Sequence, residues 1–292
     1  MGRRGKLPET GTPIWHLRES DPFAPSRSHA TTRLGILLPD DASQQRLFST
    51  GIERVSRLGS ARPVPIPNSS DAAWVQDASG RDWVIKWEES TGFQPLLAEA
   101  LCWLLGQQLG VLQPAGAVFL EGERRAWLSK RVPQVAHWDA SRSHFLTNPS
   151  ELGAMLALDA IAHNADRRSD NILLQPSPDE LHLRAFAIDS GNALIGWSDF
   201  YGLGLQVPEA RNLAPGLPID LLTDGVLAAA SKATALKSGQ ILAMVTEACE
   251  IARDPGKVAL HQALLHRLEQ APALVTDYLR KLTLVSKPQV SP

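Results

Sequence analysis

The stretch HNADRRSDNILL, residues 163–174, carries side chains whose types and spacing suit chemistry on a phosphate group. Asp166 is followed five positions later by Asn171, and a second acid, Asp189, comes eighteen positions after Asn171 in the stretch AIDSGNAL. Mg²⁺ is a hard ion that prefers carboxylate and amide oxygens, so an Asp and an Asn suit a metal. A second Asp can then accept or orient the proton of an attacking hydroxyl.

Two more polar residues stand in the first half of the chain. Lys86 ends the strand-like stretch VIKW, and Glu99 lies in the helical stretch that follows it. The phosphates of ATP need a firmly held cation, which a Lys paired with a Glu supplies. The order is therefore strand Lys, helix Glu, loop Asp with Asn five later, and strand-end Asp. Phosphoryl transfer from ATP requires this set of residue types.

The first half of the chain reads as short strands around one helix. Apolar residues recur at helical spacing over 94–111, and Gly110 offers a C-terminal stop. The turn residues DASG and EGE predict two β-hairpins, over 72–87 and 115–132. The second half is mostly helical, with two short strands around the turn SPDE. Its helices are expected over 148–165, 220–235, 237–254 and 257–284.

Composition divides the chain into three parts. Residues 1–45 are rich in Pro, Ser, Thr and Arg, which predicts a flexible or partner-dependent arm. Residues 46–132 form the expected smaller lobe of strands plus one helix, and residues 133–292 form the larger helical lobe. The predicted fold class is α+β.

Other charged residues near the loop have simpler interpretations. Asp159 lies one helical turn before His163, which predicts a local pair between them rather than a metal site. Arg167 and Arg168 are interpreted either as a solvated loop pair or as contacts to a phosphate or to nearby acids.

Charge and cysteine content exclude several classes of protein. The net charge is −2, which argues against general binding to nucleic acid. Cys102 and Cys249 have no metal-ligand spacing and make no disulfide framework, so a reducing cytoplasm is expected. We find no signal peptide and no apolar run long enough to span a bilayer.

In the order and spacing of these residues, the chain resembles the kinase superfamily. Within it the chain is most similar to the HipA-like kinases, toxin kinases of bacterial toxin–antitoxin systems whose catalytic loop is related to that of the phosphatidylinositol 3- and 4-kinases. ADRRSDNILL resembles the DRHxxN loop of that family, with Arg168 where His is usual. AIDSG resembles its metal-binding segment, and DWVIKW and LLAEALCWLLGQQLGV resemble its nucleotide strand and the following helix. The resemblance spans about residues 50–200 and implies a bilobal, protein-kinase-like fold.

The resemblance also implies a role for each residue of the set. Asp166 would be the catalytic acid/base, and Asn171 and Asp189 would bind Mg²⁺. Lys86 would bind the phosphates of ATP, and Glu99 would hold Lys86.

Two further stretches would complete the nucleotide site. Adenine would bond to backbone groups around Leu128 to Lys130, where the hinge between lobes is expected. The stretch PIPNSSDAAW stands where the family has a phosphate loop, but it lacks the usual glycines. Ser69 and Ser70 offer N–H groups and hydroxyls to a phosphate there. They are also candidates for autophosphorylation.

The predicted function is that of a serine/threonine protein kinase, which transfers the γ-phosphoryl group of ATP to a protein hydroxyl. By the resemblance, its substrate would be a translation factor or an aminoacyl-tRNA synthetase, and an antitoxin-like protein would be its partner. Two alternatives remain open. One is a pseudokinase-like binding module, which the missing glycines favour, and the other is a lipid or small-molecule kinase with the same core.

Overall fold

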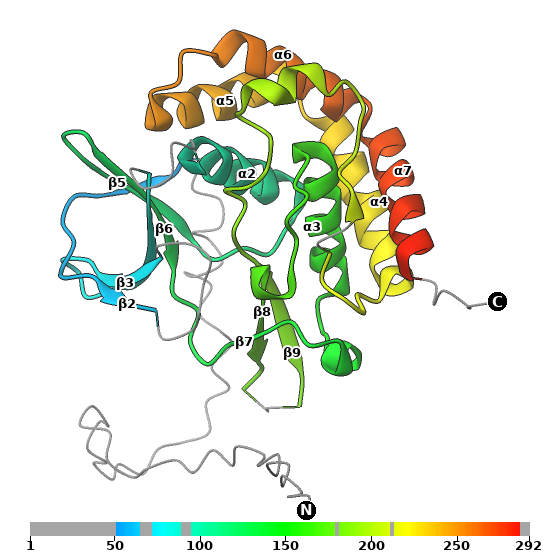
Figure 1. The fold of residues 1–292 in the computed structure, drawn as a ribbon, viewed down its shortest axis with the longest axis horizontal. Helices are drawn as coiled ribbons and strands as arrows, with labels where there is room; N and C mark the ends of the chain where they lie inside the picture. Colours follow the sequence, from blue (N-terminus) through cyan, green and yellow to red (C-terminus); the bar gives the residue numbers. More distant parts are fainter. Residues whose placement is uncertain (1–50, 65–71, 89–94, 179–180, 211–212, 287–292) are drawn as a thin grey trace, which may run out of the picture. The chain divides into compact units, whose positions relative to one another are not determined.

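A computed structural model describes residues 51–64, 72–88, 95–178, 181–210 and 213–286 (Figure 1). All of these residues belong to the unit Gln45–Pro292. The predicted arm 1–45 and the phosphate-loop candidates Ser69 and Ser70 lie outside the described residues, and the predicted domain limits stay predictions.

The first half of the described chain forms a mixed six-stranded sheet with the strand order β1-β5-β6-β4-β3-β2. β1 runs parallel to β5, and the other pairs are antiparallel. Both predicted hairpins, β3–β4 and β5–β6, are confirmed. The strands are Glu53–Val55 (β1), Arg62–Pro63 (β2), Ala73–Gln76 (β3), Asp82–Trp87 (β4), Gly116–Glu121 (β5) and Arg124–Lys130 (β6).

The alternation of side chains along β4 decides which face of the sheet Lys86 points to. Successive side chains of a strand face opposite sides of the sheet. Trp83 and Ile85 are fully buried in the core of the sheet, whereas Val84 and Lys86 line a cleft on its other face. The turn before β4 is fixed by Asp77, whose carboxylate accepts hydrogen bonds from the backbone and side chain of Arg81 and from the indole N–H of Trp83.

The predicted first helix is confirmed as α2, Pro95–Leu109. Figure 1 shows it between the sheet and the helices of the second half, and it contacts β6, α3, α4 and α5. Because it is covered on several sides, most of its residues are buried, and Glu99 is only 5% exposed. The helix stops where predicted, since Gly110 has φ +86 and donates its N–H to the carbonyl of Gly106.

The second half contains a small antiparallel sheet and a group of helices. The sheet has the strand order β7-β8-β9, and its β8–β9 hairpin is the predicted pair of short strands. These strands are Ala136–His137 (β7), Ile172–Pro176 (β8) and Leu183–Ala187 (β9). The α-helices are Pro149–Ala162 (α3), Ile219–Ala235 (α4), Ser238–Ala252 (α5), Lys257–Glu269 (α6) and Ala271–Ser286 (α7). Short 3₁₀ turns cover Ala140–Phe145, Ser169–Asn171 and Ser198–Gly202.

One helix prediction was wrong. The sequence predicts a single helix over 257–284, but the structure divides it into α6 and α7 at Gln270. Pro272 explains the break, because a proline has no N–H for a helical hydrogen bond and is tolerated only in the first turn of a helix. The remaining predicted helices of this half are present, and none of the described helices has the length and apolarity that a bilayer crossing requires.

Candidate active site

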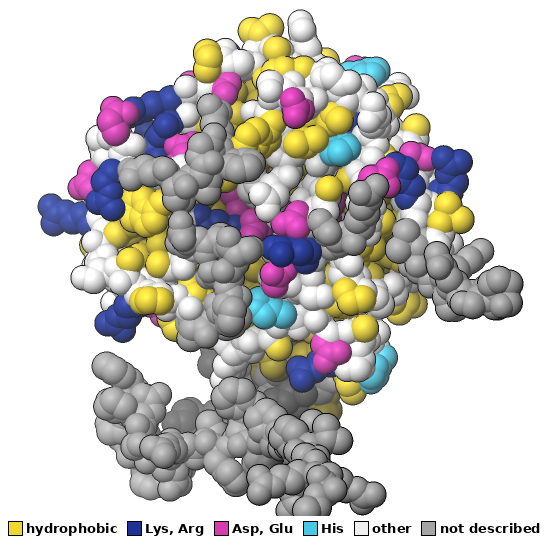
Figure 2. Space-filling model, in the orientation of Figure 1, with side chains coloured by type: hydrophobic (Ala, Val, Ile, Leu, Met, Phe, Trp, Pro, Cys, Tyr) yellow, Lys and Arg dark blue, Asp and Glu magenta, His cyan; other side chains and the backbone are white. Residues whose placement is uncertain are grey.

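A cleft of about 330 Å³ lies between the first sheet and the small sheet. The first sheet and the end of β6 contribute Val84, Lys86, Ser129 and Lys130, and the other side contributes Asn171, Leu173, Ile188 and Asp189. Figure 2 shows acidic and basic side chains gathered in the middle of the face it presents. The cleft therefore combines apolar walls with charged groups at one end.

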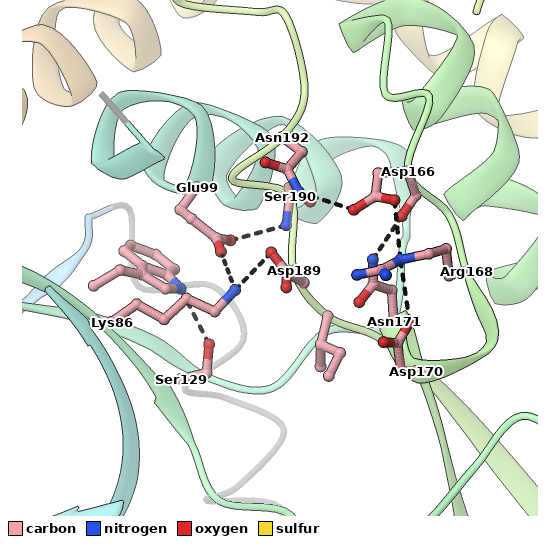
Figure 3. A network of polar contacts seen from close by, with 12 residues as sticks. Lys86, Glu99, Ser129, Asp166, Arg168, Asp170, Asn171, Asp189, Ser190 and Asn192 are labelled. Carbon is pink, nitrogen blue, oxygen red and sulfur yellow. Dashed lines mark hydrogen bonds and ion pairs between the residues drawn. The ribbon is translucent and has the colours of Figure 1, made fainter. Parts of the chain in front are cut away.

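Lys86, Glu99 and Asp189 form a charged cluster at this end (Figure 3). The Nζ atom of Lys86 lies 2.8 Å from Oε1 of Glu99 and 2.6 Å from Oδ1 of Asp189. Burial alone would lower the pKa of Lys86, but the carboxylates of Asp189 and Glu99 raise it above its ordinary value. Lys86 is therefore a fixed cation, held by acids from a helix and from a loop.

The loop that follows β9 brings Asp189 to this cluster. Ser190 donates its backbone N–H to Oε2 of Glu99 at 3.1 Å, so both oxygens of Glu99 are engaged. Asp189 has φ +58, a left-handed conformation that is uncommon outside glycine and concentrates at functional sites. Burial would raise the pKa of Asp189, but Lys86, assisted by Arg167, lowers it, so the carboxylate is ionised.

Asp166 and Asn171 stand on the loop between α3 and β8, on the other side of Asp189 (Figure 3). The side-chain amide of Asn171 donates to the backbone carbonyl of Asp166 at 2.5 Å. Since its Nδ2 is committed there, Asn171 presents its Oδ1 as an acceptor. The backbone N–H of Asp166 donates to Oδ1 of Asn164 at 3.1 Å. Both polar groups of the Asp166 backbone, the N–H and the carbonyl, are thus hydrogen-bonded within the loop.

The carboxylate of Asp166 has a partner at each oxygen. Nε of Arg168 lies 3.0 Å from Oδ1, and Nδ2 of Asn192 donates to Oδ2 at 2.8 Å. Arg168 also approaches Asp170, at 3.5 Å. The sequence interpretation missed Asn192, although its place in the Gly-Asn turn three residues after Asp189 was a signal.

A buried ion pair anchors the whole loop. The guanidinium of Arg167 donates to both oxygens of Asp159 on α3, each at 2.9 Å, and to the carbonyls of Asn171 and Ile188. The interpretation of Arg167 as a solvated residue was wrong, because it is 1% exposed. The expected pair between Asp159 and His163 was also wrong, since Asp159 bonds Arg167 and Asn164 instead.

The predicted hinge residues lie at different depths. Leu128 is fully buried and its strand is paired on both sides, with Ile85 and Ala117, so its side chain belongs to the core of the sheet. Lys130, two residues later, lines the cleft together with Ser129 and Arg131. The cleft therefore meets the chain at the end of β6 rather than at Leu128.

Asn171 and Asp189 fit a divalent cation by their donor chemistry. The amide of Asn171 presents an oxygen and the Asp189 carboxylate is ionised, and hard cations such as Mg²⁺ take these oxygen ligands. Both residues line the same cleft as Lys86.

Comparisons with known proteins place the fold. No family model matches the chain, and no curated protein sequence matches it. Among solved structures, the proinflammatory kinase CtkA of Helicobacter pylori is 10% identical, with a TM-score of 0.54 over 80% of this chain and 99% of that one. HipA of Shewanella oneidensis MR-1, solved in a toxin–antitoxin complex with HipB and operator DNA, is 13% identical over 85% of this chain and 76% of that one, with a TM-score of 0.45. The likeness to CtkA confirms the fold predicted from the sequence: the chain has a bilobal, kinase-like α+β fold.

Proposed function

We propose that this protein is an ATP- and Mg²⁺-dependent kinase that transfers the γ-phosphoryl group to the hydroxyl of a Ser or Thr in a protein. One observation carries the proposal: Lys86, paired with Glu99, meets Asp189 within the cleft that Asn171 also lines. The kinase-like fold supports it.

Each residue has a task in this reaction. Lys86 binds phosphate oxygens, and Glu99 keeps its ammonium group in place. Asn171 and Asp189 would hold the metal, which would supply positive charge that neutralises the phosphates. The acceptor oxygen attacks the γ-phosphorus, the bond from that phosphorus to the β–γ bridging oxygen breaks, and ADP leaves. Asp166 accepts or orients the proton of the acceptor hydroxyl.

The far end of the cleft suits adenine. We propose that the base bonds backbone groups at the end of β6, beside Lys130, with Leu128 supporting this strand from the core. Ser69 and Ser70 stay predicted phosphate contacts, as does their autophosphorylation. A translation factor or aminoacyl-tRNA synthetase as substrate, and an antitoxin-like partner, likewise stay predictions.

The test uses the full chain with radiolabelled ATP and Mg²⁺, alone and with a bacterial cell extract. We expect label on protein. Asp166→Asn should still bind ATP in calorimetry but lose transfer, and Lys86→Met should lose most ATP affinity, because the phosphates lose their cation. Wild-type protein that neither binds ATP nor transfers label would refute the proposal. Label in a lipid or metabolite fraction would change the acceptor class.

A second function, a nucleotide-binding module without transfer, has a specific observation in its favour. Both oxygens of the Asp166 carboxylate are already engaged, by Arg168 and by Asn192. An acceptor hydroxyl must replace or share one of these contacts. Wild-type protein that binds ATP but transfers no label to protein, lipid or metabolite would identify this function.

A further inference from the structure

The turn that follows Asp189 touches both halves of the site. Asp189 contacts Lys86, the N–H of Ser190 donates to Glu99, and the amide of Asn192 donates to Asp166 (Figure 3). A hydrogen bond of 3.0 Å from the N–H of Ala193 to the carbonyl of Ser190 closes the turn. Four consecutive residues therefore connect the phosphate-binding cation to the proposed base.

This turn lies tightly against α2. A Cβ atom added at Gly191 would lie 3.2 Å from Cβ of Pro95 and 3.5 Å from Oε1 of Glu99. These contacts leave little room for the turn to shift, so the backbone of Asn192 is held relative to Glu99. The amide of Asn192 can then act as a fixed donor.

Asn192 belongs to a different segment of the chain from the other partners of Asp166. Asn164, Arg168 and Asn171 belong to the same loop as Asp166 and can move with it. Among the described contacts of the Asp166 carboxylate, the one from Asn192 comes from the Asp189 segment. We propose that Asn192 is a positioning residue, which fixes the Asp166 carboxylate relative to the Asp189 segment so that it faces the acceptor hydroxyl. This inference rests on the proposed kinase function.

Without this donor, the carboxylate of Asp166 would keep the contact with Arg168, whose guanidinium also reaches Asp170. The carboxylate would then be free to turn toward Arg168 and away from the acceptor. A misplacement of about 1 Å at a reacting group can cost on the order of 100-fold in rate. The cation at Lys86 keeps its two acids, so ATP binding should be unchanged.

The test is steady-state kinetics of Asn192→Leu, which keeps the branched side-chain skeleton and removes the donor. We expect kcat to fall about 10- to 100-fold, the range seen when residues that orient a functional group are lost, with KM for ATP and the ATP affinity in calorimetry within about twofold of wild type. Asn192→His, which retains an N–H donor, should recover part of kcat. The matched control is Gln175→Leu, which removes an equally exposed amide hydrogen bond, that to the carbonyl of Pro133, and should leave all three quantities unchanged.

The outcomes separate the inference from the function. Transfer by Asn192→Leu at the wild-type rate would overturn the inference and leave the kinase function standing. A parallel loss of kcat, ATP affinity and thermal stability would also overturn it, because that pattern describes a structural residue. Wild-type protein without transfer would overturn the function and this inference together. If Asn192→Leu does not fold, Asn192→Ala provides the same comparison with a shorter side chain that also lacks the donor.

Discussion

The buried pair of Asp159 and Arg167 allows a sharp prediction about the loop that carries Asp166. Both residues are 1% exposed, and the guanidinium also bonds the carbonyls of Asn171 and Ile188. Arg167→Met keeps much of the apolar volume but leaves Asp159 as a buried charge. Removing one partner of a buried pair costs about 3–5 kcal/mol. Since domains are stable by about 5–15 kcal/mol, this single change should remove a large part of the free energy of unfolding.

A double variant tests the cause of that loss. Asp159→Leu combined with Arg167→Met removes both charges together, and apolar replacements of a whole buried pair are often nearly neutral. The carbonyls of Asn171 and Ile188 and the amide of Asn164 would still lose their partners, at about 1–3 kcal/mol each if they stay dry. We therefore expect the double variant to be more stable than Arg167→Met, but less stable than wild type.

Urea-induced unfolding measures the free energy of unfolding of Arg167→Met and of the double variant, provided that their m-values match that of wild type. The control is Arg280→Met on α7, because Arg280 pairs with Asp277 at the surface and its side chain is 75% exposed. A surface pair contributes at most about 1 kcal/mol. The reasoning is refuted if Arg167→Met costs no more than this control. It is also refuted if the double variant loses as much free energy of unfolding as the single variants Asp159→Leu and Arg167→Met lose together.

Two further predictions concern stability. Gly153→Ala should destabilise the protein by about 1–3 kcal/mol despite the better helix propensity of Ala, because the new Cβ would lie 2.3 Å from the carbonyl oxygen of Leu222 on α4. Thermal unfolding checks this beside Gly239→Ala on α5, where nothing lies within 4 Å of the new Cβ and no loss is expected. Burial, with Arg267 nearby, lowers the pKa of His163, so the unfolded chain binds more protons than the native one and stability falls as the pH drops below about 6.5. His163→Asn, which tolerates the left-handed backbone at φ +52, should show a shallower loss of Tm between about pH 7 and 5; an unchanged slope would contradict this assignment.

The cluster of Lys86, Glu99 and Asp189 was predictable because local patterns decide its geometry. The alternation of β4 turns Lys86 toward the cleft, and the helical spacing of α2 puts Glu99 on the face that meets the sheet. The β8–β9 hairpin returns the chain to the same place, and Asp189 follows its last strand. Their gathering in space thus follows from element types, whereas their roles in phosphoryl transfer stay a proposal.

The contacts that hold Asp166 were not predictable in the same way. Arg167 looks like one of two neighbouring loop arginines, yet it is buried and Arg168 is partly exposed. What separates them is Asp159, which faces the loop from the buried side of α3. That choice depends on how the loop packs on the helix, and no local period in the sequence encodes it. For Asn192 the sequence signals the turn but not the contact, because its partner Asp166 lies 26 residues away.

Electrostatics indicate that Lys86 and Asp189 keep their charges over a wide range of pH. The raised pKa of Lys86 keeps its charge, and the stability it contributes, at every pH below about 10, and that contribution disappears only as the pH rises through the raised value. The lowered pKa of Asp189 keeps its contribution above about pH 4, and that is lost only as the pH falls through the lowered value. The charges of Lys86 and Asp189 are therefore constant across the physiological pH range. The side chain of Asp166 is about as exposed as those of Lys86 and Asp189, and Arg168 and Asn192 occupy its two oxygens. In the proposed reaction the acceptor hydroxyl therefore has to replace or share one of these two contacts.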